Sequence, residues 1–395
     1  MALTAACGRA GFALRDAAVD TVVEPDAAPD TPAPQQLLAC GAPVRFSITG
    51  TPQHLAATGT LDGYDVFAVE DGVVRGDSYQ FAGDRTSNTL VAAHSDVVVA
   101  DNAAATLGAV ALGDDVLVAM PYASTDGAGT AVIPLDRELV SRGTPTKRDG
   151  AFAASGSIAS SAGGHLALLS QDLDLGPGGG AAVSAQLISP LGADVVAAAI
   201  PVEVVSADEH PNNPTITPGR SGFVVTWTAT ARSPHQVFAR VLDEMGQPDV
   251  ATTLISVQLE FTPTAPRAAY AAAADRFLFA WYQKVNNIDQ IWASLRDGNL
   301  APIGDPILVS SQGIFPVVAA GDRDFLVVWS DGGQPAHLGA ARIAIDGTRT
   351  PLGIAASGGS LGDWDLTVRH GQSALVWSEV GGSGPNLWID PLCDR

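Results

Sequence analysis

The chain has 395 residues, of which 46% are apolar, 16% are charged, 42 are glycine and 26 are proline. This apolar fraction suffices for a large hydrophobic core and excludes a wholly disordered chain. The 42 acidic residues outnumber the 21 Lys and Arg residues, and the resulting net charge of −21 repels phosphates, so we expect no nucleic-acid partner. No apolar stretch approaches the roughly 18 residues that a membrane-spanning helix needs.

The N-terminal residues resemble the end of a bacterial lipoprotein export signal. In LTAAC (residues 3–7), small residues precede a cysteine, as they do where such signals are cleaved and lipidated. The basic start and the apolar stretch of about 7–15 residues that a signal requires are missing. We therefore expect that the true start lies upstream, that residues 1–6 are the remnant of a signal peptide, and that Cys7 is the lipid attachment site.

Residues 7–37 are predicted to be a tether. Within them, residues 16–36 hold four prolines and five acidic residues without a basic partner. Proline and like charge together favour an extended, solvated chain, which would lift a folded domain off a membrane surface. A disordered terminus of any other origin would have the same composition.

From about residue 43 the sequence repeats. Four apolar strands rich in β-branched and aromatic residues each end near a tryptophan, and these tryptophans are 54, 48 and 48 residues apart: Trp227, Trp281, Trp329 and Trp377. A shorter strand precedes each of them, and the first three are followed by an alternating strand and a tight turn. Upstream, Phe67, Met120 and Ser170 continue the series at similar spacing.

Four strands in each repeat of roughly 40–55 residues are typical of β-propeller blades. We predict an all-β fold in which residues 38–395 form a single propeller of seven four-stranded blades. The repeated tryptophans are expected to fill the space between blades. Two sandwich domains would have similar strand content but would not explain the regular spacing.

The last repeat lacks a fourth strand, and a segment near the N-terminus resembles one. Residues 43–49 are therefore predicted to complete the last blade and close the ring. Cys393 ends the third strand of that blade and Cys40 precedes the added strand, so the two would lie within reach of a disulfide. We predict this disulfide and an oxidising compartment; two unpaired thiols are the alternative.

Ligands of propellers bind mainly on one face, in loops between blades and between the second and third strands of each blade. The densest polar cluster in such a loop is SADEHPNNP (206–214). Polar residues of this kind also occur in solvated turns that bind nothing. The candidate ligand-binding residues are Asp208, Glu209, His210, Asn212, Asn213, Asn286, Asn287, Asp289, Asp331 and, as an aromatic platform for a sugar, Trp364.

No motif for catalysis, metal binding or cofactor binding is evident. The seven histidines lack metal-ligand spacing, and residues 172–176 match a calcium loop only in part. The glycine-rich residues 176–180 lack the lysine of a phosphate-binding loop. We therefore predict no catalytic residue, no metal and no cofactor.

FPVVAAGDRDFLVVWSD (315–331) resembles the degenerate repeat P-x-V-A-x-G-x-x-F-L-V-V-W-x-D of secreted bacterial lipoproteins with propeller folds. The resemblance covers residues 210–380 well and residues 43–200 only by spacing. It implies an exported, non-enzymatic module anchored at the cell envelope, in contact with the membrane only through its lipid. We expect a monomer that acts as a binding or scaffolding surface for a glycan, a peptide or a protein.

Two other functions remain open at this point. A carbohydrate-active enzyme, either a glycoside hydrolase or a lyase, would be favoured by two carboxylates, or by a carboxylate and His210, that converge in a deep central pocket. A structural protein that packs its ring edge against partners would have no pocket and would expose an apolar patch.

The predicted disulfide can be tested by peptide mapping. Mass spectrometry of exported material under non-reducing conditions should find a Cys40–Cys393 crosslink. Free thiols at both positions would contradict the prediction.

Overall fold

The computed structural model describes residues 35–36, 44–47, 52–70, 73–81, 90–101, 107–124, 127–149, 157–172, 180–195, 199–206, 211–229, 235–249, 251–256, 263–333, 336–353, 360–369, 372–381 and 384–392. The chain divides into two units, Met1–Pro34 and Gln35–Arg395. Residues 1–34, with the predicted lipidation site Cys7, lie outside the described residues, as do Cys40 and Cys393. The lipid anchor and the disulfide therefore stay predictions. The described part of the chain contains no helix long and apolar enough to cross a membrane.

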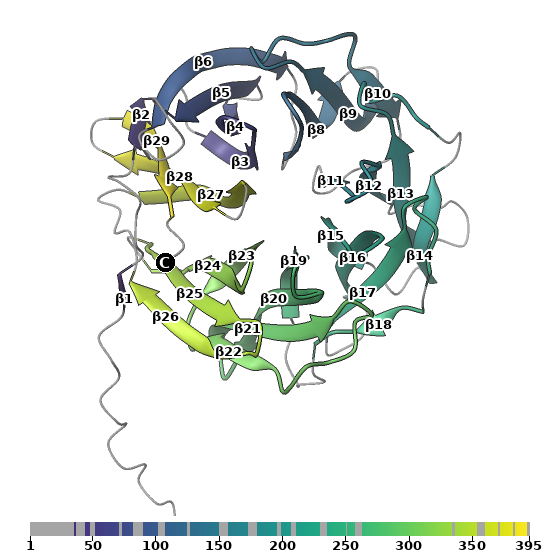
Figure 1. The fold of residues 1–395 in the computed structure, drawn as a ribbon, viewed down its shortest axis with the longest axis vertical. Helices are drawn as coiled ribbons and strands as arrows, with labels where there is room; N and C mark the ends of the chain where they lie inside the picture. Colours follow the sequence, from purple (N-terminus) through teal and green to yellow (C-terminus); the bar gives the residue numbers. More distant parts are fainter. Residues whose placement is uncertain are drawn as a thin grey trace, which may run out of the picture. The chain divides into compact units, whose positions relative to one another are not determined.

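The unit Gln35–Arg395 is a ring of seven antiparallel sheets, which we number as blades in the order of their first strands (Figure 1). Blade 1 consists of β3 (Pro52–Gly59), β4 (Gly63–Glu70), β5 (Val73–Phe81) and β6 (Leu90–Asp101). Blade 2 consists of β7 (Gly108–Leu112), β8 (Asp115–Ser124), β9 (Gly127–Leu135) and β10 (Thr146–Asp149). Blade 3 consists of β11 (Ile158–Ser160), β12 (Leu166–Asp172), β13 (Gly180–Ile188) and β14 (Ile200–Ser206).

The remaining blades follow the same order. Blade 4 consists of β15 (Pro211–Pro218), β16 (Gly222–Ala229), β17 (Gln236–Asp243) and β18 (Thr253–Leu254). Blade 5 consists of β19 (Pro263–Ala271), β20 (Arg276–Val285), β21 (Ile288–Asp297) and β22 (Ile307–Ser310). Blade 6 consists of β23 (Ile314–Ala320), β24 (Asp324–Ser330), β25 (Leu338–Ala344) and β26 (Arg349–Gly353). Blade 7 consists of β27 (Ser360–Arg369), β28 (Gln372–Gly381), β29 (Gly384–Pro391) and β2 (Val44–Ser47).

The first strand of each blade lies nearest the centre of the ring (Figure 1). Second strands are buried on both faces; every residue of β16, for example, is buried. The third strands alternate more between buried and half-buried residues, and β17 is an example. This difference follows from the sequence patterns, because continuous apolar runs suit a strand covered on both sides. The predicted seven-bladed propeller is confirmed.

The ring closes through the strand predicted from the N-terminal region. β2 pairs antiparallel with β29, so that Val44 lies opposite Ile389 and Ser47 lies opposite Asn386. A further short strand, β1 (Gln35–Gln36), pairs in parallel with β26 and adds a fifth strand to the outer edge of blade 6. β1 could not be predicted from the sequence, because two residues are too few to carry a hydrophobic period.

The repeated tryptophans pack between neighbouring blades, as predicted. Trp227, Trp281, Trp329 and Trp377 are each at most 7% exposed, and each belongs to a core cluster shared with the preceding blade. Two of the four indole N–H groups donate to a side chain two residues later on the same strand, since Trp281 Nε1 is 2.9 Å from Gln283 Oε1 and Trp377 Nε1 is 2.8 Å from Glu379 Oε1. The large rings are therefore fixed in position.

Phe67 differs from this register. It lies in the expected second strand but packs with blade 2, the following blade, in a cluster that includes Met120. Its neighbours Val66 and Ala68 face blade 7 instead. Successive residues of a strand point to opposite faces, so the predicted alignment of blade 1 was wrong by one residue.

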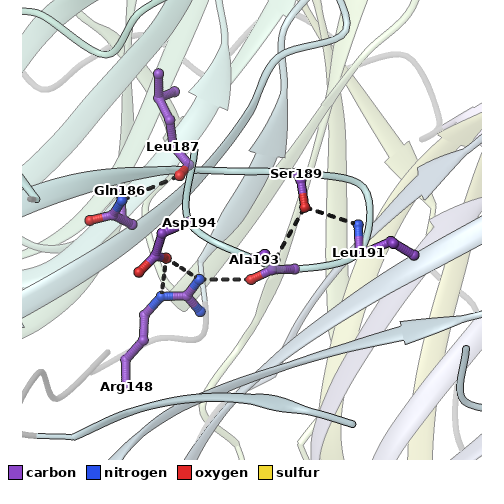
Figure 2. A network of polar contacts seen from close by, with 8 residues as sticks. Arg148, Gln186, Leu187, Ser189, Leu191, Ala193 and Asp194 are labelled. Carbon is purple, nitrogen blue, oxygen red and sulfur yellow. Dashed lines mark hydrogen bonds and ion pairs between the residues drawn. The ribbon is translucent and has the colours of Figure 1, made fainter. Parts of the chain in front are cut away.

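A tight turn that directly follows the third strand recurs in several blades. Its first side chain accepts hydrogen bonds from two backbone N–H groups further along the turn, as Asp243 does from Met245 and Gln247, both at 2.8 Å. Ser189 plays the same part in blade 3 (Figure 2). There Arg148 of β10 also reaches across from blade 2 and donates to Asp194 Oδ1 and to a turn carbonyl (Figure 2). These turns therefore also help to hold adjacent blades together.

The contact between Gly339 and Trp329 generates a stability prediction. A Cβ atom on Gly339 would lie 2.3 Å from Trp329 Cε2, and Trp329 is held in the core between blades 5 and 6. Gly339→Ala is expected to lower the free energy of unfolding by about 1–3 kcal/mol, because an overpacked core must shift. Thermal unfolding should show this loss, whereas Gly143→Ala, where the added atom meets nothing within 4 Å, should leave the melting temperature unchanged.

Asp390 generates a prediction about pH. This carboxylate is only 3% exposed and its Oδ1 has no hydrogen-bond partner, and burial raises its pKa to about 6. The folded protein therefore binds this proton more tightly than the unfolded chain does. Protonated Asp390 makes its full contribution to the free energy of unfolding below about pH 4, and this contribution is lost as the pH rises to about 6. Above that pH the buried charge costs about 2–3 kcal/mol.

Asp390→Asn should therefore be more stable than the wild type at pH 7.5 and closely similar to it at pH 4.5. The measurement is the difference in unfolding free energy between the two proteins at each pH. An equal difference at both pH values would contradict the assigned ionisation.

Candidate functional site

Several innermost strands contain a β-bulge near their first residues. The pairing with the second strand shifts register in β3, β15, β19, β23 and β27. A bulge places an extra residue on one strand and redirects the neighbouring side chains. The five bulges therefore turn side chains from five blades toward a common region at the centre of the ring.

These side chains surround a cavity of about 550 Å³, which we call the central pocket. Its volume is typical of small-molecule binding sites. The lining residues come from blades 1, 4, 5, 6 and 7, so the pocket exists only in the closed ring. They are His54, Asn213, Ala265, Arg267, Ile314, Phe315, Pro316, Val317, Ser330, Gly332, Gly333, Ala336, Leu361, Gly362, Asp363 and Trp364.

Three lining residues have an unusual backbone conformation. Asn213, Ala265 and Phe315 have φ angles of 50°, 48° and 52°, and each directly precedes a proline. Asparagine tolerates this left-handed conformation, but for a bulky residue such as phenylalanine it is a genuine outlier. Conformations of this kind concentrate at functional sites, where the surrounding fold holds them in place.

Two carboxylates of β27 join blade 7 to blade 1 beside the pocket. Asp363 Oδ2 accepts a hydrogen bond from Leu55 N, and Asp365 Oδ2 accepts one from Ala57 N, both at 2.9 Å. The other oxygen of each carboxylate accepts the N–H of the following residue in β27. Asp363 lines the pocket, whereas Asp365 does not.

The pKa values of these groups are shifted mainly by burial. Burial raises the pKa of Asp365 to about 6, against the opposing effect of the backbone N–H groups of Ala57 and Leu366. Burial also raises the pKa of Asp363, while backbone N–H donors, His54 and Arg267 oppose the rise. Burial lowers the pKa of Arg267, and the two nearby carboxylates counteract that effect. Asp363, His54 and Arg267 therefore form a cluster of interacting ionisable side chains on the pocket wall.

Of the residues proposed from the sequence, Asn213 and Trp364 line the central pocket. Asn212 is in β15 but does not line it, and Asp331 supports the adjacent loop by accepting N–H groups of Gly333 and His337, both at 2.9 Å. Asp208, Glu209 and His210 lie outside the described residues.

The remaining three candidates lie in the hairpin between β20 and β21, away from the pocket lining. Asn286 and Asn287 form its turn with φ angles of 51° and 63°, which asparagine adopts readily. Asp289 forms an ion pair with Lys284 at 3.5 Å. The structure therefore gives these residues a local role in the turn.

Sequence reasoning missed His54, Arg267, Phe315 and Asp363. Part of the signal was present, because three bulges carry the same pattern: a residue followed by proline at the start of a first strand. The charged residues had no such signal. Asp363 and His54 are 309 positions apart, and only ring closure brings them together.

No three or more His, Cys, Asp or Glu side chains within the described ranges are grouped in a way that could hold a metal ion. The described lining of the central pocket offers a carboxyl, an imidazole, a guanidinium and two aromatic rings.

No family model matches the sequence, and no curated protein matches it. Solved structures with a similar fold do exist. One is the polysaccharide lyase Uly1, with a TM-score of 0.52 and 11% identity over 95% of this chain and 94% of that one. Another is a protein of unknown function from Dyadobacter fermentans DSM 18053, with a TM-score of 0.51 and 11% identity over 74% of this chain and 95% of that one. At these identities the similarity shows the fold alone.

Proposed function

We propose that the protein is a carbohydrate-active enzyme whose central pocket binds a glycan, with Asp363 and His54 as the acid–base groups. The observation that carries the proposal is the convergence of Asp363, His54 and Arg267 in one pocket of about 550 Å³. This replaces the non-enzymatic binding function expected from the sequence with its alternative, because the sequence offered no such cluster.

The raised pKa of Asp363 suits a general acid. Burial increases the share of its protonated form, which can donate to the oxygen of a glycosidic bond. Each carboxylate oxygen already accepts one backbone N–H group, from Leu55 and from Trp364. A second lone pair on each oxygen remains to carry the proton.

His54 and Arg267 supply the complementary chemistry. An imidazole is the commonest general base in enzymes, so His54 would take a proton from the attacking water. The guanidinium of Arg267 offers several fixed N–H donors for sugar oxygens, although one of its nitrogens already donates to Pro266 O at 3.1 Å. In hydrolysis, water then adds to the anomeric carbon while the leaving oxygen receives the proton of Asp363.

Glycan recognition without turnover is the second candidate function. It is favoured by the hydrogen bonds that tie the carboxylate of Asp363 to β3 and to its own strand, which also give this residue a structural role. In that case the same pocket would bind a sugar through Asp363, Asn213 and the aromatic rings.

Asp363→Asn separates these functions. If Asp363 is the general acid, the variant should lose at least about 100-fold in turnover while its affinity for oligosaccharide changes only a few-fold. Candidate substrates are first found by incubating the protein with a panel of neutral and acidic polysaccharides and measuring the release of reducing ends and of unsaturated products.

Asp365→Asn is the matched control. It disturbs the same kind of bond between β27 and β3 but does not line the pocket. An equal loss of turnover in both variants would indicate a structural role for Asp363. Oligosaccharide binding without turnover by the wild type would support glycan recognition alone. If the wild type shows neither binding nor turnover, the proposed function is contradicted.

A further inference from the structure

Phe315 is the most exposed aromatic side chain of the central pocket. It is 50% exposed, whereas Trp364, the platform expected from the sequence, is half-buried and packs against the core between blades 6 and 7. The ring of Phe315 lies edge-on to Tyr282, with centroids 5.2 Å apart and an interplanar angle of 72°. Tyr282 belongs to blade 5, so a residue from the neighbouring blade braces this ring.

The position of Phe315 does not itself require an aromatic residue. Asn213 in blade 4 and Ala265 in blade 5 occupy the corresponding bulges with nearly the same φ angle. At φ of 52° the backbone of a non-glycine residue is strained, and an exposed ring gains little from the core in return. A strained, exposed aromatic at a pocket is therefore best explained by contact with a ligand.

The charges around the pocket indicate which ligands fit. Arg267 is the only guanidinium among the described residues that line the pocket, and it interacts with the carboxylates of both Asp363 and Asp365. An acidic sugar would have to compete with these two carboxylates and would approach a protein with a net charge of −21. An uncharged sugar avoids both penalties, and the C–H groups on one face of a pyranose ring can lie flat on an aromatic ring.

We propose that Phe315 is the platform on which the central pocket holds the apolar face of an uncharged pyranose, and that the pocket selects neutral over acidic glycans. This inference rests on the proposed function, because it names the substrate class of the same pocket. It assigns Phe315 to binding, whereas Asp363 and His54 are assigned to the reaction.

The test uses two variants that keep the backbone favourable. Phe315→Gly and Phe315→Asn both tolerate the left-handed conformation, and asparagine occupies the corresponding position in blade 4. Isothermal titration calorimetry with cellohexaose, xylohexaose, mannohexaose and a galacturonate hexamer should show binding of a neutral oligosaccharide by the wild type. Both variants should bind it roughly tenfold more weakly, with melting temperatures equal to or above that of the wild type.

Ile288→Ala is the control, because Ile288 is equally exposed on the β20–β21 hairpin but lies outside the pocket lining. It should leave the affinity unchanged. Unchanged affinity in both Phe315 variants would overturn the platform. Binding or cleavage of the galacturonate hexamer in preference to the neutral ones would overturn the substrate class while leaving the proposed function intact. Failure of the wild type to bind any of the four would overturn the inference, and the polysaccharide panel then decides the proposed function separately.

Discussion

The joint between blade 7 and blade 1 is the interaction on which the rest of the structure depends. β2 supplies the outer strand of blade 7 from the opposite end of the chain, and Asp363 and Asp365 bind backbone N–H groups of β3 at the centre. Between these points, Tyr64 and Tyr79 of blade 1 pack with Ile389 of blade 7, and all three are fully buried. An open ring would expose this apolar surface to water, at a cost proportional to its area.

The central pocket depends on the same joint. His54 lies on the blade 1 side and Asp363 on the blade 7 side, and the hydrogen bond from Leu55 to Asp363 connects the two strands. Asp363 therefore serves ring closure and faces the pocket at once. Burial of a carboxylate in this position raises its pKa because the charged form loses water, and the backbone donors recover only part of that loss. Closure of the ring thus places at its centre a carboxyl group whose pKa is raised by burial.

Much of the fold could be predicted because each blade repeats a local pattern. Trp227, Trp281, Trp329 and Trp377 mark the second strands at a regular spacing, and burial between blades explains why large rings recur there. The prediction for Phe67 was wrong by one residue because blade 1 lacks the tryptophan that sets the register. Residues 43–49 could be placed in blade 7 because the last repeat lacked a strand and this segment resembled one.

The candidate site could be predicted only in part. Asn213 and Trp364 were proposed from loop position and chemistry, and both line the pocket. Asn286, Asn287 and Asp289 looked equivalent in sequence, yet they lie in the hairpin between β20 and β21, outside the pocket lining. Polar residues in turns and polar residues in sites have the same composition, so a single sequence does not separate them.

The sequence by itself determined the strands, their grouping into blades, the number of blades and the segment that closes the ring. These features depend on the alternation of apolar residues and on turn chemistry, which act over a few residues. Tertiary structure alone decided that His54, Arg267, Phe315 and Asp363 meet in one pocket. Their meeting depends on four bulged strands, β3, β19, β23 and β27, and on closure between the two ends of the chain. Contacts across hundreds of residues leave no periodic signal in the sequence.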